Sequence, residues 1–271
     1  MGPLRHDRRR LRRICLCQSL KVVGRRAIEH LRRHLGRLRA SLGIDLVVAN
    51  GENAAEIHGI TAADADALLG TGIDLLTLGN HAFSARDIGD YLDDHAADII
   101  RPANYPAACP GMGSTTRTVS GLRVLCMNVS GVAFLEPLAD PFSTVDRILE
   151  REAGQYDVAL LDMHAEATSE KVAMGYYLDG RVQVVFGTHT HVPTADGRVL
   201  RGGTGYITDL GMTGPKDGIL GTDAAAVLRK MQTHMPTRFT VAAGEIEAQA
   251  VLFTLEDRPP YRCTAVERVA F

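Results

Sequence analysis

The sequence predicts an α/β or layered α+β protein whose strands are covered on both faces. From about residue 40, short runs rich in Val, Ile and Leu end in polar residues, and a helix-like stretch usually follows. Continuous apolar runs are typical of strands buried on both sides, whereas a strand with one solvent face alternates apolar and polar residues. The 271 residues suffice for one substantial core.

The expected elements follow in order along the chain. An apolar run at 44–49 ends at Asn50-Gly51-Glu52-Asn53, and Thr61 is a suitable N-cap for a helix over 62–69, because its hydroxyl can accept a hydrogen bond from a free backbone N–H. A second run, at 73–78, ends at Gly79-Asn80-His81 and precedes a helix over 84–92. Further strands are expected at 122–127, 157–161, 182–186, 206–208, 238–242, 245–254 and 263–269.

Charge and composition exclude some classes of protein and divide the chain. The formal net charge of −2 does not indicate a nucleic-acid polymer or a membrane as partner, and no window has the ~18 apolar residues of a membrane span. The arginine-rich run at 5–13 is an exception, so we expect residues 1–20 to be an atypical basic segment and residues 21–271 a single domain. Five scattered cysteines are typical of free thiols in a reducing compartment, and we expect a cytoplasmic protein.

Residues able to bind metal gather where the expected strands end. Sites in α/β proteins form beyond the carboxyl ends of strands, so side chains far apart in sequence are expected to converge there. His189-Thr190-His191 is the clearest signal, since two imidazoles two residues apart can reach one metal region; the alternative is a pair of exposed or core histidines. The full candidate set is Glu52, Asn53, Asn80, His81, His164, His189 and His191.

Each candidate has a functional and a structural interpretation. Glu52 is either a carboxylate that bridges two cations or a solvated loop residue. The Asn80 amide is unusual for structural zinc but suits a two-metal site that handles oxyanions; otherwise it caps a helix. His81 is either an acid that protonates a leaving oxygen or a packed side chain.

The segment after the fourth apolar run, at 157–161, adds further candidates. His164 is an expected ligand, held in place by Asp162 or Glu166. The hydroxyls of Thr168 and Ser169 can either contact an oxyanion or cap a helix. Asp209 opens a glycine-rich segment that either lies over the site and contacts substrate or forms a surface turn.

Several long segments resemble the YmdB-like metallophosphoesterases, a family of the calcineurin-like superfamily. Among them are Val48-Ala49-Asn50-Gly51-Glu52-Asn53 and Gly187-Thr188-His189-Thr190-His191, and the resemblance extends from about Gly24 to the C-terminus. The segments that carry it are 48–55, 78–81, 101–106, 164–171, 187–196 and 209–215.

The resemblance implies a four-layer α/β/β/α sandwich with a dinuclear metal centre. Iron or manganese would be the usual metal, with zinc as a further option, and the substrate would be a small phosphodiester of the 2′,3′-cyclic nucleotide type. A homo-oligomer is one option for the assembly of the chain. Glu52 would bridge the metals and His81 would be the acid near the leaving group. The further ligands, or residues beside them, would be Asn53, Asn80, His164, His189 and His191.

The start of the chain departs from the family pattern. Relatives open with an apolar strand ending in Gly-Asp, but the position of that aspartate falls near Gln18 here. Either a metal ligand has been lost, or the first twenty residues are not the native start; a shifted reading frame would explain both the arginine run and a lost first strand. The chain would then be an impaired phosphodiesterase or a regulator that binds metal or a phosphorylated ligand. A third interpretation is an RNA-binding protein that uses the arginine arm.

Overall fold

The computed structural model describes residues 13–18, 24–55 and 58–271, and these residues form two sheets packed face to face. The seven strands of the first sheet are β1 (Arg13–Gln18), β2 (Leu46–Asn50), β3 (Leu75–Thr77), β4 (Ile99–Ile100), β11 (Thr213–Pro215), β12 (Ile246–Leu255) and β13 (Cys263–Ala270). Their order is β11-β12-β1-β2-β3-β4, with β13 beside β12. Strands β1 to β4 run parallel, whereas β12 is antiparallel to β1.

The second sheet has six strands in the order β5-β6-β7-β8-β10-β9. They are β5 (Ser114–Val119), β6 (Leu122–Ser130), β7 (Val158–His164), β8 (Val184–Thr188), β9 (Arg198–Val199) and β10 (Gly205–Ile207). The middle four strands, β6, β7, β8 and β10, are parallel, and an antiparallel strand closes each edge.

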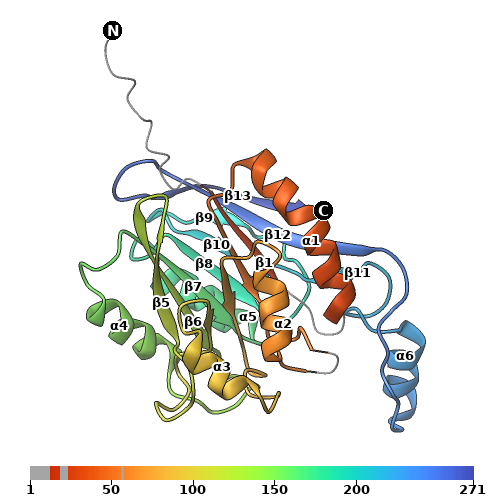
Figure 1. The fold of residues 1–271 in the computed structure, drawn as a ribbon. Coiled ribbons are helices and arrows are strands. Elements are labelled where there is room, and N and C mark those ends of the chain that lie inside the picture. The colour runs from red at the N-terminus through yellow and green to blue at the C-terminus, as the bar shows by residue number, and fades with distance from the viewer. Residues whose placement is uncertain (1–12, 19–23, 56–57) are drawn as a thin grey trace.

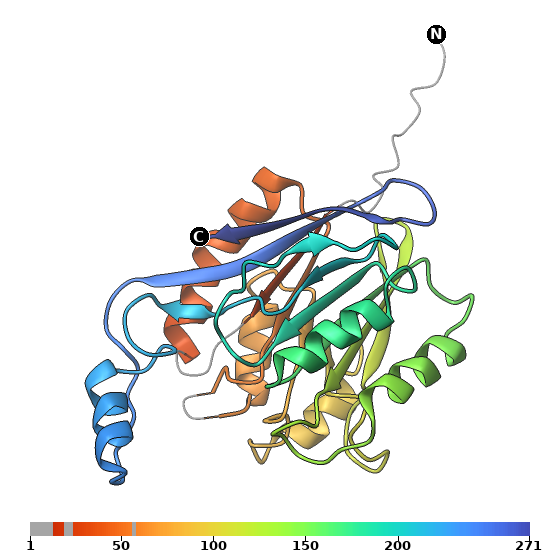
Figure 2. The same ribbon diagram turned by 180° about the vertical axis from the view of Figure 1, so that it is seen from behind.

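Helices cover the outer face of each sheet, which confirms the expected α/β/β/α sandwich (Figure 1). The helices of the described residues are α1 (Gly24–Leu42), α2 (Ala62–Leu69), α3 (Ile88–Asp94), α4 (Pro141–Arg151), α5 (Thr168–Tyr177) and α6 (Ala224–Thr233). Helices α1, α2 and α3 pack on the first sheet, and α4 and α5 pack on the second. Figure 2 shows α4 and α5 on the face opposite α1.

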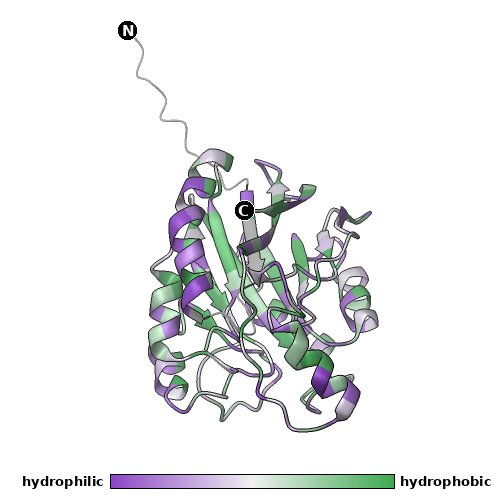
Figure 3. Ribbon diagram, turned by 90° about the vertical axis from the view of Figure 1, so that its right-hand side faces the viewer, coloured by the Kyte–Doolittle hydropathy of each residue, from purple (hydrophilic) through white to green (hydrophobic). Residues whose placement is uncertain are grey.

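Alternate residues of one strand enter different cores. In β2, Leu46 and Val48 lie in the core between the sheets, while Val47 and Ala49 face the helices of the first sheet. This is why the run at 44–49 is continuously apolar: both faces of the strand are covered. In Figure 3, green apolar residues fill the strands and purple polar residues lie on the outer sides of the helices.

The expectation of a lost first strand is wrong. Residues Arg13–Gln18 form β1, which pairs in parallel with β2 and antiparallel with β12 near the centre of its sheet. Ile14 is fully buried between the sheets. The short apolar run that follows the arginines therefore suffices for a strand. The side chain of Gln18 and the arginine run before Arg13 lie outside the described residues, and the division of the chain at residue 20 stays a prediction.

Of three further predicted features, the N-cap is confirmed, the helix begins later and the strand is wrong. Thr61 caps α2 as predicted, and Asp64 completes a capping box by bonding back to the Thr61 backbone. The helix expected over 84–92 begins later, at Ile88. The strand expected at 238–242 is wrong: within the described residues this stretch makes only an isolated bridge between Val241 and Thr222.

Helix α6 stands apart from the rest of the molecule. In Figures 1 and 2 it projects from the body, joined to it by the segments before and after it. No described helix combines the length and the apolar character needed to cross a membrane.

Candidate metal centre

The predicted site residues come from the carboxyl ends of four strands in both sheets. Asn50 at the end of β2 is paired with Thr77 at the end of β3, and His164 at the end of β7 is paired with Thr188 at the end of β8. Glu52 and Asn53 follow β2, Asn80 and His81 follow β3, and His189 and His191 follow β8. Parallel packing thus brings these residues to one edge of the sandwich.

Four of them form a tight group, which we call the ligand cluster: Glu52, Asn80, His164 and His189. The Nε2 atom of His164 lies 3.2 Å from Oε1 of Glu52 and 3.0 Å from Oδ1 of Asn80. It also lies 3.1 Å from Nδ1 of His189. Glu52, His164 and His189 each offer one ligand atom, and these atoms lie within 4.8 Å of one another.

Hydrogen bonds outside the cluster fix which ring nitrogens carry protons. The Thr188 hydroxyl donates to Oδ1 of Asp162 at 2.7 Å, so it accepts from Nδ1 of His164 at 2.9 Å. Nε2 of His189 is 2.8 Å from Oε2 of Glu166, and this N–H donates a hydrogen bond to the carboxylate. When each ring is neutral, its remaining nitrogen, His164 Nε2 or His189 Nδ1, therefore directs a lone pair toward the cluster.

The cluster has the chemistry of a cation site. A carboxylate oxygen, an amide oxygen and two imidazole lone pairs converge, and such atoms repel one another unless a positive charge lies among them. Oδ1 of Asn53 is buried beside them without a hydrogen-bond partner, as expected for an oxygen whose partner is a cation. The donor set therefore fits a metal.

The other three candidate ligands and acid, Asn53, His81 and His191, line a cavity of about 170 Å³ next to the cluster. Its walls are Asn53, His81, Glu166, His189, Thr190, His191 and Leu220. The backbone N–H of His81 donates to Oε2 of Glu52 at 3.3 Å, and its ring stacks on that of His58 with 4.6 Å between centroids. His81 is thus held at the cavity rather than packed in the core.

Electrostatics keep these groups in the forms that bind metal. Burial alone would raise the pKa of Glu52, but the charge and hydrogen bond of His164 in its protonated form, with smaller contributions from His189 and His81, lower it to about 2. Burial lowers the pKa of His189 and that of His191 to about 4 each. At neutral pH the site therefore offers a carboxylate and two neutral imidazoles.

Asp162 connects the two sheets beneath the cluster. Its carboxylate accepts from Thr77 at 2.6 Å and from the Asn50 amide at 3.3 Å, both in the first sheet, and from Thr188 in the second. Burial raises its pKa to about 6. Asp162 supports His164 through the Thr188 hydroxyl, and Glu166 contacts His189, so neither expected helper of His164 contacts it directly.

Gly79 gives the cluster its space. A Cβ atom at this position would collide with Oε2 of Glu52 and Nε2 of His164. The carbonyl of Leu78 just before it accepts from the amides of Asn128 at 2.6 Å and Asn50 at 3.2 Å. The turn that carries Asn80 is therefore fixed by buried side chains and tolerates only glycine at its start.

The loop that carries His189 and His191 is held in a strained conformation. Both residues have positive φ, 99° and 65°, which side chains other than glycine rarely adopt. Between them, the N–H and hydroxyl of Thr190 donate to Oδ2 of Asp209 at 3.1 Å and 2.7 Å. Asp209 also accepts from the buried ammonium of Lys171 at 2.8 Å. These bonds offset the strain and fix the loop.

This arrangement corrects the expectation for Asp209. The carboxylate is fully buried, and the Gly211 N–H donates to its other oxygen at 2.9 Å, so it has no face to offer a substrate. Thr168 and Ser169 are in the first turn of α5, outside the cavity lining. Neither caps the helix, since its N-cap is Ala167. Their contact with an oxyanion stays a prediction.

Some residues that matter to the geometry were given no role by the sequence analysis. Thr188 and Lys171 lie in quoted segments, but nothing in their spacing shows that they orient His164 or neutralise Asp209. Asn128 follows an apolar run, and its contact with Leu78, 50 positions away, is set only by the packing of the two sheets.

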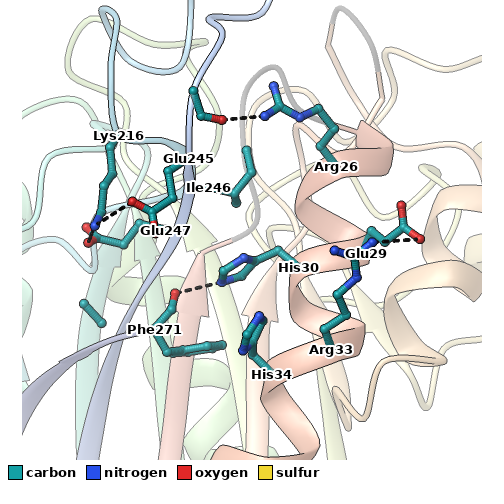
Figure 4. A pocket seen from close by; sticks show the side chains of 12 residues that line it. Arg26, Glu29, His30, Arg33, His34, Lys216, Glu245, Ile246, Glu247 and Phe271 are labelled. Atoms are coloured by element: carbon teal, nitrogen blue, oxygen red, sulfur yellow. Dashed lines mark hydrogen bonds and ion pairs between the residues drawn. The ribbon is translucent and has the colours of Figure 1, made fainter.

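A larger hollow of about 650 Å³ lies between α1 and the ends of β11 and β12 (Figure 4). Several of its charged side chains form ion pairs: Arg33 pairs with Glu29, and Lys216 pairs with Glu247 at 3.2 Å. Arg26 donates to the carbonyl of Gly244. These side chains thus have partners within the hollow, and it gives no reason to move the candidate site from the strand ends.

Comparison with known proteins shows which family the chain belongs to. The family model described as YmdB-like protein matches residues 20–269. The chain is 40% identical to the 2′,3′-cyclic-nucleotide 2′-phosphodiesterase of Bacillus subtilis (strain 168), over 92% of this chain and 93% of that protein.

Two solved structures are also similar. A hypothetical protein from Thermus thermophilus superposes with a TM-score of 0.87 and 37% identity, over 96% of this chain and 98% of that one. A novel phosphatase from Mycoplasma pneumoniae superposes with a TM-score of 0.85 and 27% identity, over 96% of this chain and 92% of that one. Since the family match spans nearly the whole described fold and includes every residue of the ligand cluster, the chain belongs to the YmdB-like protein family.

Proposed function

We propose that this chain is a metal-dependent phosphodiesterase that hydrolyses a small phosphodiester of the 2′,3′-cyclic nucleotide type. The observation that carries this proposal is the ligand cluster, in which four lone-pair atoms lie close together. That donor set suits a cation. The printed activity of the B. subtilis relative supports the substrate class.

In this proposal the site holds two metal ions, with iron or manganese as the occupants. Glu52, Asn53, Asn80, His164, His189 and His191 would hold them, with Glu52 as the residue shared by both. Metal ions held there would supply charge stabilisation for a phosphoryl group and a more acidic water. Mixed oxygen and imidazole ligands accommodate iron and manganese, and zinc is a further option.

His81 is the proposed acid near the leaving group. Its ring lies at the wall of the same cavity as His189 and His191, while its backbone is bonded to Glu52. A proton given to the leaving oxygen removes the need to expel an alkoxide. Exchange of His81 for asparagine should therefore lower kcat more for a poor leaving group, such as a ribose hydroxyl, than for p-nitrophenolate.

Gln18 motivates a second candidate function. It ends β1, and its Cα is paired with that of Asn50 at the edge where Glu52 follows. A neutral residue at this end of the strand would weaken one of the two metal positions. In that case the chain would be a weak or inactive family member that binds metal or a phosphorylated ligand as a regulator.

Metal content and turnover, measured together, separate the two functions. Wild type and His189→Ala would be assayed by elemental analysis and for hydrolysis of 2′,3′-cAMP, with Gln18→Asp as a third sample. Turnover that requires metal and disappears in His189→Ala supports the enzyme. Bound metal without turnover in wild type, together with turnover gained in Gln18→Asp, supports the regulator.

A further inference from the structure

The segment 131–139 leaves the end of β6 and passes beside the ligand cluster. The N–H of Gly131 donates to the carbonyl of His164 at 2.8 Å. The next two N–H groups, of Val132 and Ala133, donate to Oε1 of Glu170 at 2.9 Å and 3.2 Å. The start of this segment is therefore fixed to the residues around His164.

Its far end is fixed near Asn80. The Asn104 amide donates to the carbonyls of Ser130 at 2.8 Å and Ala139 at 3.0 Å, which clamps the two ends of the segment together. The neighbouring Tyr105 hydroxyl donates to the carbonyl of Asn80 at 3.4 Å. Burial, with the nearby carboxylate of Glu136, raises the pKa of Tyr105 to about 12, so the phenol keeps its proton. The segment is thus tied to His164 at its start and, through Asn104 and Tyr105, indirectly to Asn80.

Phe134 lies at the tip of this segment and faces solvent. Its side chain is 90% exposed, and its φ is 63°, an uncommon conformation for a bulky side chain. A backbone of uncommon conformation thus holds an aromatic ring in water, where burial gives it no stability.

Phe134 follows a strand end at the edge of the sheet that carries the cluster. Ser130, the last residue of β6, is paired with His164 at the end of β7. Gly131 contacts the His164 carbonyl, and the Cα atoms of Gly131 and Phe134 are at most about 11 Å apart. A nucleotide has its base separated from its phosphate by the ribose, which suits a ring placed at the rim rather than inside the site. Its flat, apolar face offers a stacking surface to any base.

We propose that Phe134 stacks on the base of the nucleotide whose phosphodiester lies at the ligand cluster. The proposal rests on the proposed function, since it takes a cyclic nucleotide as substrate. It assigns to Phe134 a role in substrate affinity, separate from the chemistry at the metals. It also predicts tolerance for different bases, because a stack makes no hydrogen bonds to the edge of the base.

The chain contains no tryptophan, so Phe134→Trp introduces a single indole fluorophore. The variant would be titrated with adenosine 2′,3′-cyclic phosphorothioate, a slowly hydrolysed analogue, and with base-free ribose 2′,3′-cyclic phosphate. Phe239→Trp is the matched control, because Phe239 is also exposed, at 53%, but follows α6. We expect saturable quenching only in Phe134→Trp and only with the adenosine compound.

Kinetics give a second, independent readout. Phe134→Ala should raise KM for 2′,3′-cAMP by roughly 5- to 150-fold, the loss expected for one base–aromatic stack, with kcat unchanged. KM for the base-free substrate should stay the same, and Phe134→Tyr should restore the wild-type value.

The outcomes separate this inference from the proposed function. Absent quenching, equal quenching in both tryptophan variants, or an equal loss on both substrates overturns the role of Phe134 while the hydrolase stands. Base-dependent quenching in a protein that fails to hydrolyse 2′,3′-cAMP with added metal supports the stack and rejects the hydrolase.

Discussion

Replacing Gly79 with alanine adds one methyl group at the ligand cluster. The new Cβ would overlap Oε2 of Glu52 and Nε2 of His164. Ordinary contact begins at about 3.5 Å, so one or both side chains must move by on the order of 1 Å. Both are fully buried, and the turn itself is fixed through the Leu78 carbonyl, so the displacement falls on the ligands.

A displacement of this size should abolish most of the activity. A misplacement of about 1 Å costs on the order of 100-fold in rate, and loss of a ligand costs at least as much as the ~10–100-fold typical of supporting residues. We therefore expect Gly79→Ala to lower kcat/KM for bis-p-nitrophenyl phosphate at least about 100-fold and to lower metal content per chain.

Gly36→Ala is the matched control. This glycine lies in helix α1 with no atom within 4 Å of the added Cβ, so the change should leave activity intact and stabilise the helix by up to about 1 kcal/mol. Urea unfolding in EDTA shows whether Gly79→Ala still folds. If the folded variant keeps its metal and hydrolyses the substrate within about twofold of wild type, our description of the ligand cluster is incorrect.

Three further predictions concern stability and metal binding. Asp209→Ala leaves the Lys171 ammonium buried without its partner and should destabilise the fold by about 3–5 kcal/mol in urea unfolding. Asp146→Ala, which removes a partly exposed ion pair, should cost no more than about 1 kcal/mol; equal losses would contradict the assignment. Mn²⁺ should raise the melting temperature of the chelated protein, because it binds the folded state only, and an unchanged melting temperature would count against the site. Since burial lowers the pKa of His189 and of His191 to about 4, both stay neutral as the pH falls through the ordinary histidine range. Bound metal should therefore persist at about pH 5.5 in equilibrium dialysis and be released as the pH approaches about 4; half-release near about pH 6.5 would show that the rings titrate as free histidines.

The layers and most of the site edge were predictable because they depend on local pattern. Doubly buried strands such as β2 need continuous apolar runs, and the polar residues after them mark the carboxyl ends. His189-x-His191 was the clearest single signal, and the ligand-type residues at the other strand ends made metal binding the favoured interpretation. The first strand was misjudged because the arginine run before Ile14 obscured a short apolar strand whose stability comes from neighbours on both sides.

Contacts between distant segments could not be predicted from the sequence. Asp209 lies in a glycine-rich stretch that resembles a substrate loop, and only the fold brings Lys171, 38 positions away, into contact with its carboxylate. The hydrogen bond between Thr188 and Asp162 joins two paired strands, β8 and β7, and only the pairing of these strands brings the two residues together. Phe134 lies in no recognisable sequence motif, and only its exposure and its backbone conformation in the structure single it out.

The central claim, a metal-dependent phosphodiesterase centred on Glu52, Asn80, His164 and His189, is tested most directly by activity as a function of metal content. Chelated wild type would be titrated with Mn²⁺ while metal per chain and hydrolysis of 2′,3′-cAMP are followed in the same sample. We predict turnover that rises with bound metal and saturates, and no rise in His189→Ala. Hydrolysis that is equal in the chelated and the loaded protein, or metal uptake unchanged by His189→Ala, would contradict it.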